Sequence, residues 1–445
     1  MVRSASLPAT DAARQTLGDK ITIGSARLPG FIAARTHDFP FALLTDNATI
    51  ETMKTVFDPP VRLIIAILAL SCAQPADTAT GAENERGGPR PRLRVLNGSA
   101  QTIEIFWLKS DSERVPNGVV KPGRDTIITT TLGHRFAVVG SKDRTEHVVT
   151  SEALVQAFRF DPPDKDGIPA FYTQRASANG FPIVASGKVN PYALKEAVYL
   201  ANMMLAKRPD VRDAMIKSGA RLSILAWNEF TCDQPEWKWM AKRPVPGFPG
   251  ISPRDFRDAR ARGMGGSLTD PYCSCAEENL LAYQGDPYAA ESIFIHEFAH
   301  NIHLRGMSNV DPGFDRRVKK SYDAAMKAGL WKGKYASVNH HEYFAEGVQS
   351  WFDDNRENDH DHNHVNTRAE LIEYDPGLAG LCREVFGDTV LKYTKPATRL
   401  HGHLEGYDPS KAPTFVWPKR LEKAKKAIRA KAQARSRGKA DKKKK

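Results

Sequence analysis

Two histidines and a glutamate with metal-binding spacing occur in one short stretch, as His296, Glu297 and His300 in the order His-Glu-Phe-Ala-His. In a helix, residues four apart lie one turn apart on the same face, so both imidazoles can bind one metal ion. Glu297 lies one step further round, where it can take a proton from a water molecule at that ion. The flanking residues are apolar almost all round, which predicts a buried helix: Ile293, Phe294, Ile295, Phe298, Ala299 and Ile302. A buried helix with three polar groups on one side indicates a metal site.

A third metal ligand must come from elsewhere, because a catalytic zinc ion normally has three protein ligands and one open position. His303 lies further along the same predicted helix, and one rigid helix cannot bring three ligands round one ion. Glu342 and Glu346 lie four residues apart in a second apolar segment, and buried carboxylates need partners. We therefore expect Glu342 to complete the metal shell and Glu346 to hold a ligand histidine through its other ring nitrogen. His340 and His341, beside Glu342, remain rival ligands.

Together these two segments resemble the catalytic domain of the anthrax lethal factor family of zinc endopeptidases, within the gluzincins. The shared residues are the His-Glu-x-x-His stretch, Tyr335 seven positions before Glu342, and the Glu-Tyr-Phe-Ala-Glu sequence that begins at Glu342. The resemblance implies a zincin-like fold in which Glu342 is the third zinc ligand. It also implies that Tyr335 stands over the metal and helps to stabilise the oxyanion.

Residues 91–160 have a different pattern, with short runs of alternating apolar and polar residues between turns, which predicts a small all-β sandwich. This segment resembles the β domain of the von Hippel–Lindau tumour suppressor. The matching residues are Asn97-Gly-Ser, Phe106-Trp-Leu, Pro122-Gly and Gly133-His-x-Phe. In that family the domain binds a hydroxyproline peptide. Trp107 and His134 match two residues of its site, whereas Thr130 and Phe136 replace two others. We expect a structural module or one that docks a partner protein.

The N-terminal region has the features of an export signal. From Met53, a basic start, a run of eight apolar residues and a few small residues follow in the order of a secretory signal peptide. The apolar run is too short to span a bilayer as a helix. We predict a signal peptide at residues 53–73, a flexible linker at 74–90, and an over-called, unassigned extension at 1–52. The protein would then be secreted or held at the cell envelope, with a lipoprotein at Cys72 as the alternative.

The net charge of +12 is confined to the C-terminus. Residues 418–445 hold 14 Lys and Arg against two acidic residues, so the rest of the chain is neutral. Because this basic tail has no apolar face after Ile428, we expect it to be disordered on its own. Its charge suits contact with an acidic polymer or a membrane surface, and nothing in it specifies nucleic acid.

Three further features concern the surroundings of the metal motif. Outside the predicted signal, four cysteines would form two disulfides in an exported protein, with three possible pairings: Cys232, Cys273, Cys275 and Cys382. Of these, Cys273 and Cys275 are too close in sequence to pair with each other. The glycines of residues 262–266 predict a flexible loop ahead of the metal helix. Residues 359–364, rich in His and Asp, predict a solvated loop or a second metal site.

At 445 residues the chain is long for one domain. We predict an α+β protein, in which a mainly helical zincin-like metallopeptidase domain at residues 165–410 follows the sandwich. One Zn²⁺ ion would be bound by His296, His300 and Glu342. Glu297 would act as general base in an exported endopeptidase with a protein or peptide substrate. Two alternatives remain: a zinc-dependent amidase that acts on cell-wall material, and a binding or adhesion protein in which zinc is structural.

Overall fold

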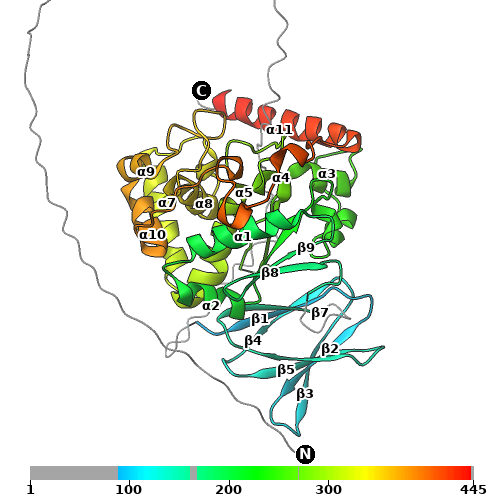
Figure 1. Ribbon diagram of the computed structural model, residues 1–445. Helices are drawn as coiled ribbons and strands as arrows, with labels where there is room; N and C mark the ends of the chain where they lie inside the picture. The colour runs from blue at the N-terminus through cyan, green and yellow to red at the C-terminus, as the bar shows by residue number, and fades with distance from the viewer. Residues whose placement is uncertain (1–88, 161–167, 269, 442–445) are drawn as a thin grey trace, which may run out of the picture. The chain divides into compact units, whose positions relative to one another are not determined.

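The computed structural model describes residues 89–160, 168–268 and 270–441, with side chains as far as residue 431 (Figure 1). Over these residues the chain is an α+β structure, as the sequence predicts. The predicted signal peptide and the stretch before it lie outside the described residues, as does almost all of the predicted linker. None of the described helices is both long enough and apolar enough to cross a membrane.

Residues 92–160 form two β-sheets, which we call the β module. The strands are β1 (Arg92–Asn97), β2 (Ile103–Leu108), β3 (Arg114–Val120), β4 (Asp125–Thr129), β5 (Arg135–Gly140), β6 (Glu146–Thr150) and β7 (Val155–Phe160). One sheet has the order β4-β1-β7 and the other β3-β2-β5-β6. Side chains from both sheets form one buried cluster, as expected where alternate residues of each strand face inward: Leu93, Val95, Ile103, Ile105, Val120, Phe136, Val138, Val149 and Phe160.

The residues that match the hydroxyproline site come together only in part. The ring centroids of Trp107 and His134 are 5.3 Å apart, and Thr130 Oγ1 lies 3.0 Å from His134 Nδ1. Phe136, by contrast, is 2% exposed and belongs to the core of the β module. It is therefore not available at a docking surface, and the match to that site is incomplete.

A third sheet lies in the part of the chain after residue 168. Its strands are β8 (Gln174–Ala178), β9 (Phe181–Ala185), β10 (Arg221–Leu225) and β11 (Tyr272–Ala276), in the order β11-β10-β9-β8. β8 and β9 form an antiparallel hairpin whose two turn residues, Asn179 and Gly180, have the positive φ angles that a tight two-residue turn requires. β9, β10 and β11 are parallel, and every residue of β10 and β11 is buried. The part of the sheet formed by β10 and β11 therefore has both faces covered, whereas β8 at the other edge is partly exposed.

Two helices begin and end at residues that are typical of helix ends. α1 (Pro191–Met204) is capped by Asn190, and α2 (Pro209–Lys217) ends shortly before Gly219. The remaining helices are α3 (Pro253–Arg260), α4 (Glu277–Leu280), α5 (Ile293–Asn301), α6 (Ser308–Val310), α7 (Phe314–Ala328), α8 (His340–Trp351), α9 (Arg368–Tyr374), α10 (Pro376–Phe386) and α11 (Glu422–Asp441). Residues Ile302–Met307 form a π-helical turn that joins α5 to α6 without a break.

The third sheet and the helices around it share one large apolar cluster, with residues from β9, β10, β11, α1, α5, α8 and α10. α5 packs against both β11 and α8. Phe298 of α5 meets Phe181 of β9 at a ring-centroid distance of 5.2 Å. The predicted metal helix is therefore a core element, and its packing fixes the direction in which its polar side chains point.

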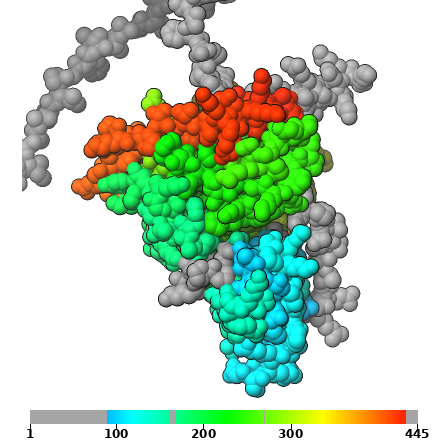
Figure 2. Space-filling view, turned by 90° about the vertical axis from the view of Figure 1, so that its right-hand side faces the viewer, coloured from blue at the N-terminus to red at the C-terminus, as the bar shows by residue number. Residues whose placement is uncertain are grey.

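The basic tail is helical up to residue 441, and the prediction of disorder was wrong for this part. α11 lies beside α3, as Figure 2 shows in orange-red against green. Leu421, Ala424 and Ile428 share a cluster with Phe230, and Arg420 forms ion pairs of 2.7 and 2.8 Å with two carboxylates of α3. Three apolar residues at helical spacing are enough to dock the first turns, although the sequence beyond them has no apolar face.

The four cysteines predicted to form disulfides are free and buried. Cys273 and Cys275 lie on β11, Cys382 lies on α10, and Cys232 packs near Trp237 in a separate apolar cluster. Burial raises the pKa of the Cys232 thiol to about 12 and holds those of the other three above their ordinary range. The structure therefore forms neither predicted disulfide, since these thiols occupy apolar core positions instead.

Candidate metal centre

Buried polar side chains hold the start of α5. Ser292 caps the helix, and its own N–H donates to Asp354 at 2.9 Å. Asn279 accepts a hydrogen bond from Ile293 N at 2.7 Å. These bonds satisfy N–H groups that the first turn of a helix leaves free. Together with the apolar packing of α5, they fix its rotation, so the histidines and glutamate of the motif have set directions.

Three ligand atoms from α5 and α8 form a nearly equilateral triangle, which we call the metal triangle. His296 Nε2 and His300 Nε2 are 3.3 Å apart, and Glu342 Oε2 lies 3.2 Å from each. Ligand atoms placed tetrahedrally at roughly 2.0–2.1 Å from a zinc ion are about 3.3 Å apart. The structure thus brings together the two histidines and Glu342 at separations that fit a single ion.

The charges around the metal triangle also favour a cation. Desolvation lowers the pKa of His296, but the hydrogen bond to Glu342 and the charges of Glu297, Glu342 and Glu346 outweigh it and raise the pKa to about 10. Burial raises the pKa of Glu342, yet the two imidazoles outweigh that effect and hold it well below its ordinary value. Two imidazoles and one carboxylate are a donor set that suits zinc.

Glu297 faces a segment that contains glycines. A Cβ at Gly265 would lie 2.6 Å from His300 Cδ2 and 2.9 Å from Glu297 Oε2, and one at Gly263 would lie 2.9 Å from Glu297 Cγ. Glycine therefore lets this backbone approach α5 closely. Glu297 itself is half-buried, and desolvation raises its pKa to about 7. That value suits a group that takes up and releases a proton near neutral pH.

The glycine segment, residues 262–266, is fixed, contrary to the expectation of a flexible loop. Arg262 is buried and pairs with Glu278 at 2.5 Å. Met264 exchanges two backbone hydrogen bonds with Ser274 of β11, at 2.8 and 3.0 Å. The segment therefore extends the outer edge of the third sheet and lies along the metal triangle.

Tyr335 lies beside the metal triangle in a buried position. It is 9% exposed, and its ring centroid is 6.0 Å from that of His296. Its backbone N–H donates to the carbonyl oxygen of Asp361 at 2.7 Å. Burial and the nearby carboxylates of Glu342 and Glu297 raise the pKa of the phenol well above its ordinary value. The hydroxyl therefore keeps its proton near neutral pH and can donate a hydrogen bond.

The outer nitrogen of His296 is held by Gln349, which the sequence analysis missed. His296 Nδ1 and Gln349 Oε1 are 2.8 Å apart, whereas Glu346 Oε1 lies 3.6 Å from the same nitrogen. Gln349 Nε2 donates to Glu291 at 3.0 Å, so its oxygen faces the imidazole. Gln349 thus keeps a proton on His296 Nδ1, so Nε2 is the nitrogen that a metal ion would bind in place of its proton. Gln349 lies seven residues after Glu342, on the same helix face, and that spacing is the signal that could have revealed it.

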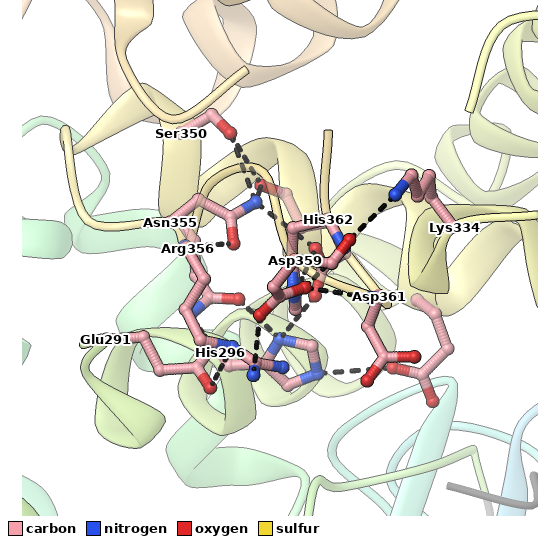
Figure 3. A network of polar contacts seen from close by, with 12 residues as sticks. Glu291, His296, Lys334, Ser350, Asn355, Arg356, Asp359, Asp361 and His362 are labelled. Atoms are coloured by element: carbon pink, nitrogen blue, oxygen red, sulfur yellow. Dashed lines mark hydrogen bonds and ion pairs between the residues drawn. The ribbon is translucent and has the colours of Figure 1, made fainter. Parts of the chain in front are cut away.

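Glu346 supports the site one step further back. Its Oε2 lies 3.2 Å from His362 Nε2 and accepts a hydrogen bond of 3.1 Å from Asn355. His362 Nδ1 in turn lies 2.9 Å from Asp359 Oδ1 (Figure 3), and His362 is only 4% exposed. Residues 359–364 are therefore not a solvated loop. They form a partly buried support behind the metal triangle, which also holds the backbone of Tyr335.

The rival ligands are not at the metal triangle. The Nε2 atoms of His303, His340 and His341 lie 3.0, 3.1 and 3.5 Å from Asp315 Oδ1, at the start of α7. We call these four residues the Asp315 cluster. These histidines face Asp315 and not the metal triangle, although His341 directly precedes Glu342 in the sequence.

Neither a protein-family model nor a curated protein sequence matches this chain. Among solved structures, it is similar to the Pro-Pro endopeptidase PPEP-2 from Paenibacillus alvei, with 14% sequence identity and a TM-score of 0.32. The similarity covers 46% of this chain and 97% of that one. At that TM-score we draw nothing from the likeness.

Proposed function

We propose that the protein is a zinc-dependent metallopeptidase with a zincin-like catalytic region of the gluzincin type. The observation that supports it best is the metal triangle of His296, His300 and Glu342, with edges of 3.2–3.3 Å, beside the half-buried carboxylate of Glu297. Three protein ligands leave one position of a tetrahedral ion open, as catalytic zinc sites require. The resemblance of both motifs to the lethal factor family favours peptide bonds as the substrate.

When bound, zinc supplies a Lewis acid that polarises a carbonyl group and acidifies water. Glu297, with a pKa of about 7, takes a proton from the attacking water and returns it to the leaving amine. Tyr335 keeps its hydroxyl proton and donates a hydrogen bond to the oxygen on which negative charge develops. Gln349 holds the ring of His296 in the tautomer that ligation requires.

The test compares wild-type protein with Glu297→Gln on a peptide library and on isolated cell-wall fragments, with products identified by mass spectrometry. We expect the wild type to cleave peptides and the variant to be slower by about 10²–10⁴-fold. Zinc content should be the same in both, because Glu297 is not a ligand. Zinc content therefore serves as the control that the site is intact.

Two outcomes would replace the proposal. If wild-type protein cuts cell-wall amides and no peptide, the site belongs to an amidase. If Glu297→Gln retains every measurable function while removal of zinc by a chelator melts the protein, the zinc is structural and the protein is a binding protein.

Export and domain organisation are proposals that rest on the sequence alone. We propose that residues 53–73 direct secretion, that residues 91–160 and 165–410 are separate domains, and that the β module docks a partner. N-terminal sequencing of protein recovered outside the cell tests the first point. A mature chain that begins shortly after Ala73 supports it, and a chain that begins at Met1 contradicts it.

A further inference from the structure

Four polar side chains converge away from the metal triangle, at the junction of three helical segments. His303 comes from the π-helical turn after α5, Asp315 is the second residue of α7, and His340 and His341 are the first two residues of α8. The ligand atoms of Asp315, His340 and His341 all lie within 4.8 Å of one another. His303 Nε2 is 3.0 Å from the same carboxylate oxygen on the buried side.

Hydrogen bonding does not explain this arrangement. A single oxygen, Asp315 Oδ1, faces three imidazole nitrogens at 3.0, 3.1 and 3.5 Å, yet one carboxylate oxygen offers about two lone pairs. His303 is completely buried between the rings of Phe314 and Phe344, at centroid distances of 5.4 and 5.1 Å. Nδ1 of His303 has no hydrogen-bond partner among the described residues, and Nε2 lies 3.0 Å from Asp315 Oδ1 without hydrogen-bond geometry. A poorly aligned contact leaves a buried ring nitrogen poorly satisfied, so His303 Nε2 suits a cation shared with Asp315 better than a hydrogen bond to it.

We propose that the Asp315 cluster binds a second divalent metal ion of the zinc class, with Asp315, His303, His340 and His341 as its ligands. Imidazole nitrogens with one carboxylate oxygen suit Zn²⁺, Co²⁺ or Ni²⁺. Coordination uses the lone pair of His303 Nε2 and removes the excess of donors around one oxygen. The side chains of Asp315, His340 and His341 are 32%, 20% and 34% exposed, which gives an ion a path from solvent.

The protonation states in the Asp315 cluster are those that ligation needs. Desolvation lowers the pKa of His303 to about 4, so its imidazole is neutral at pH 7. Burial raises the pKa of Asp315, but its three imidazole neighbours outweigh this and hold it far below the ordinary value. A neutral imidazole and an ionised carboxylate can both bind a metal without first losing a proton.

The second ion would position the catalytic ligand set without taking part in the reaction. It would tie the first turn of α8 to the start of α7 and to the π-helical turn, and Glu342 lies in that first turn of α8, directly after His341. A π-helical turn is uncommon and is often found at functional sites. This inference goes beyond the proposed function, because the Asp315 cluster can bind its ion whether or not the metal triangle is catalytic.

The test counts ions in purified full-length protein that is stripped by a chelator, dialysed against Zn²⁺ alone and measured by mass spectrometry. We expect two ions per chain in wild-type protein and one in Asp315→Ala. His300→Ala, which removes a ligand of the metal triangle, should also hold one ion. The matched control, His401→Ala, removes an exposed histidine outside both sites and should hold two.

Two further variants keep the test decisive if Asp315→Ala fails to fold. His340→Ala/His341→Ala removes only partly exposed side chains and should also hold one ion. In the His300→Ala background, Zn²⁺ should raise the thermal midpoint by several degrees, and addition of His340→Ala/His341→Ala should abolish this shift.

A wild-type protein that saturates at one ion, or an Asp315→Ala variant that binds as many ions as the wild type, would overturn the second site. The variants also separate this inference from the proposed function. If His300→Ala binds one ion fewer than wild type and Asp315→Ala binds as many as wild type, the second site does not exist and the metal triangle is the metal site. If Asp315→Ala binds one ion fewer than wild type and His300→Ala binds as many, the Asp315 cluster is the metal site and the metal triangle of the proposed function binds no ion.

Discussion

The metal triangle and the Asp315 cluster both draw on α8 and on the continuous stretch of α5 and the π-helical turn, and α7 adds Asp315 to the cluster. The two sites have opposite proportions of carboxylates and imidazoles. Around His296 stand three carboxylates, whereas in the Asp315 cluster three imidazoles stand around one carboxylate. The pKa of His296 is therefore raised to about 10 in spite of desolvation, and that of His303 is lowered to about 4 by desolvation in spite of Asp315. The same residue type is thus charged or neutral according to its neighbours.

The two sites also differ in what stands behind their imidazoles. His296 Nδ1 contacts Gln349, and Gln349 donates a hydrogen bond to Glu291. Glu291 in turn forms an ion pair of 3.0 Å with Arg356 (Figure 3). His303 has the rings of Phe314 and Phe344 beside it, and its Nδ1 has no hydrogen-bond partner within the part of the chain that the structure describes. Outer hydrogen bonds hold a ligand in place before the ion arrives. We infer that the metal triangle is preorganised, and that the Asp315 cluster depends on its ion for order.

Removal of one ligand from each site in turn should give the largest difference between the two sites. Glu342→Ala leaves two imidazoles in the metal triangle, so zinc should be lost and peptide cleavage should fall by more than the roughly 10²–10⁴-fold expected for Glu297→Gln. Asp315→Ala leaves the metal triangle intact and should cost far less in kcat/KM. Equal losses of activity and zinc in the two variants would mean that the sites act as one.

Gln349 offers the second-largest effect. Gln349→Leu removes the acceptor for His296 Nδ1 and frees the ring, so zinc affinity should fall by about 10–100-fold in a chelator competition. Glu346→Gln is the matched control, because Glu346 lies on the same helix and only 3.6 Å from the same nitrogen. If Glu346→Gln costs more affinity than Gln349→Leu, the outer partner of His296 is the glutamate that the sequence indicated.

This difference between Gln349 and Glu346 illustrates how far sequence reasoning reaches. The spacing of His296 and His300 on one helix, and the buried position of Glu342, follow from periodicity and from the cost of burying a carboxylate. Which of Glu346 and Gln349 contacts His296 does not follow from the sequence, because it depends on how α8 is rotated against α5, and packing sets that rotation. A charged residue looked like the better acceptor, yet the amide lies nearer.

The Asp315 cluster shows the other limit of prediction. His303, His340 and His341 were visible as candidate ligands, but Asp315 was not, because it reaches them only when α7 packs beside α8 and the π-helical turn. No local pattern in residues 302–307 predicts a π-helical turn. The fold class was accessible because it depends on many residues at once, whereas this convergence depends on one docking geometry.

The backbone that closes over the metal triangle gives a smaller effect. Gly265→Ala places a methyl group where His300 Cδ2 and Glu297 Oε2 now lie, at 2.6 and 2.9 Å, so the segment must shift. We expect kcat/KM to fall about tenfold, below the roughly 10²-fold that a displacement of 1 Å can cost. Gly380→Ala is the control, since a Cβ there meets nothing within 4 Å in α10, and it should stabilise the helix by about 0.5–1 kcal/mol. Equal activity in both variants would show that the segment is not packed on the site.

His362, behind the metal triangle, should show the smallest effect on activity and a distinct dependence on pH. Desolvation and, to a smaller extent, the charge of Arg356 lower its pKa. Glu346 and Asp359 outweigh both effects and raise the pKa to about 10. Because the folded pKa exceeds the unfolded value of about 6.5, the stability from this pair is fully present below that pH and is lost as pH rises through about 10. His362→Gln keeps a donor for Glu346 without the titration. The stability advantage of wild type over His362→Gln in urea unfolding should therefore shrink by several kcal/mol between about pH 6 and pH 10.5, because a difference of one pH unit between the folded and unfolded pKa corresponds to about 1.4 kcal/mol. A constant difference over that range would mean that His362 is neutral in the folded protein, as His303 is in the Asp315 cluster, and that Glu346 is held by neutral donors.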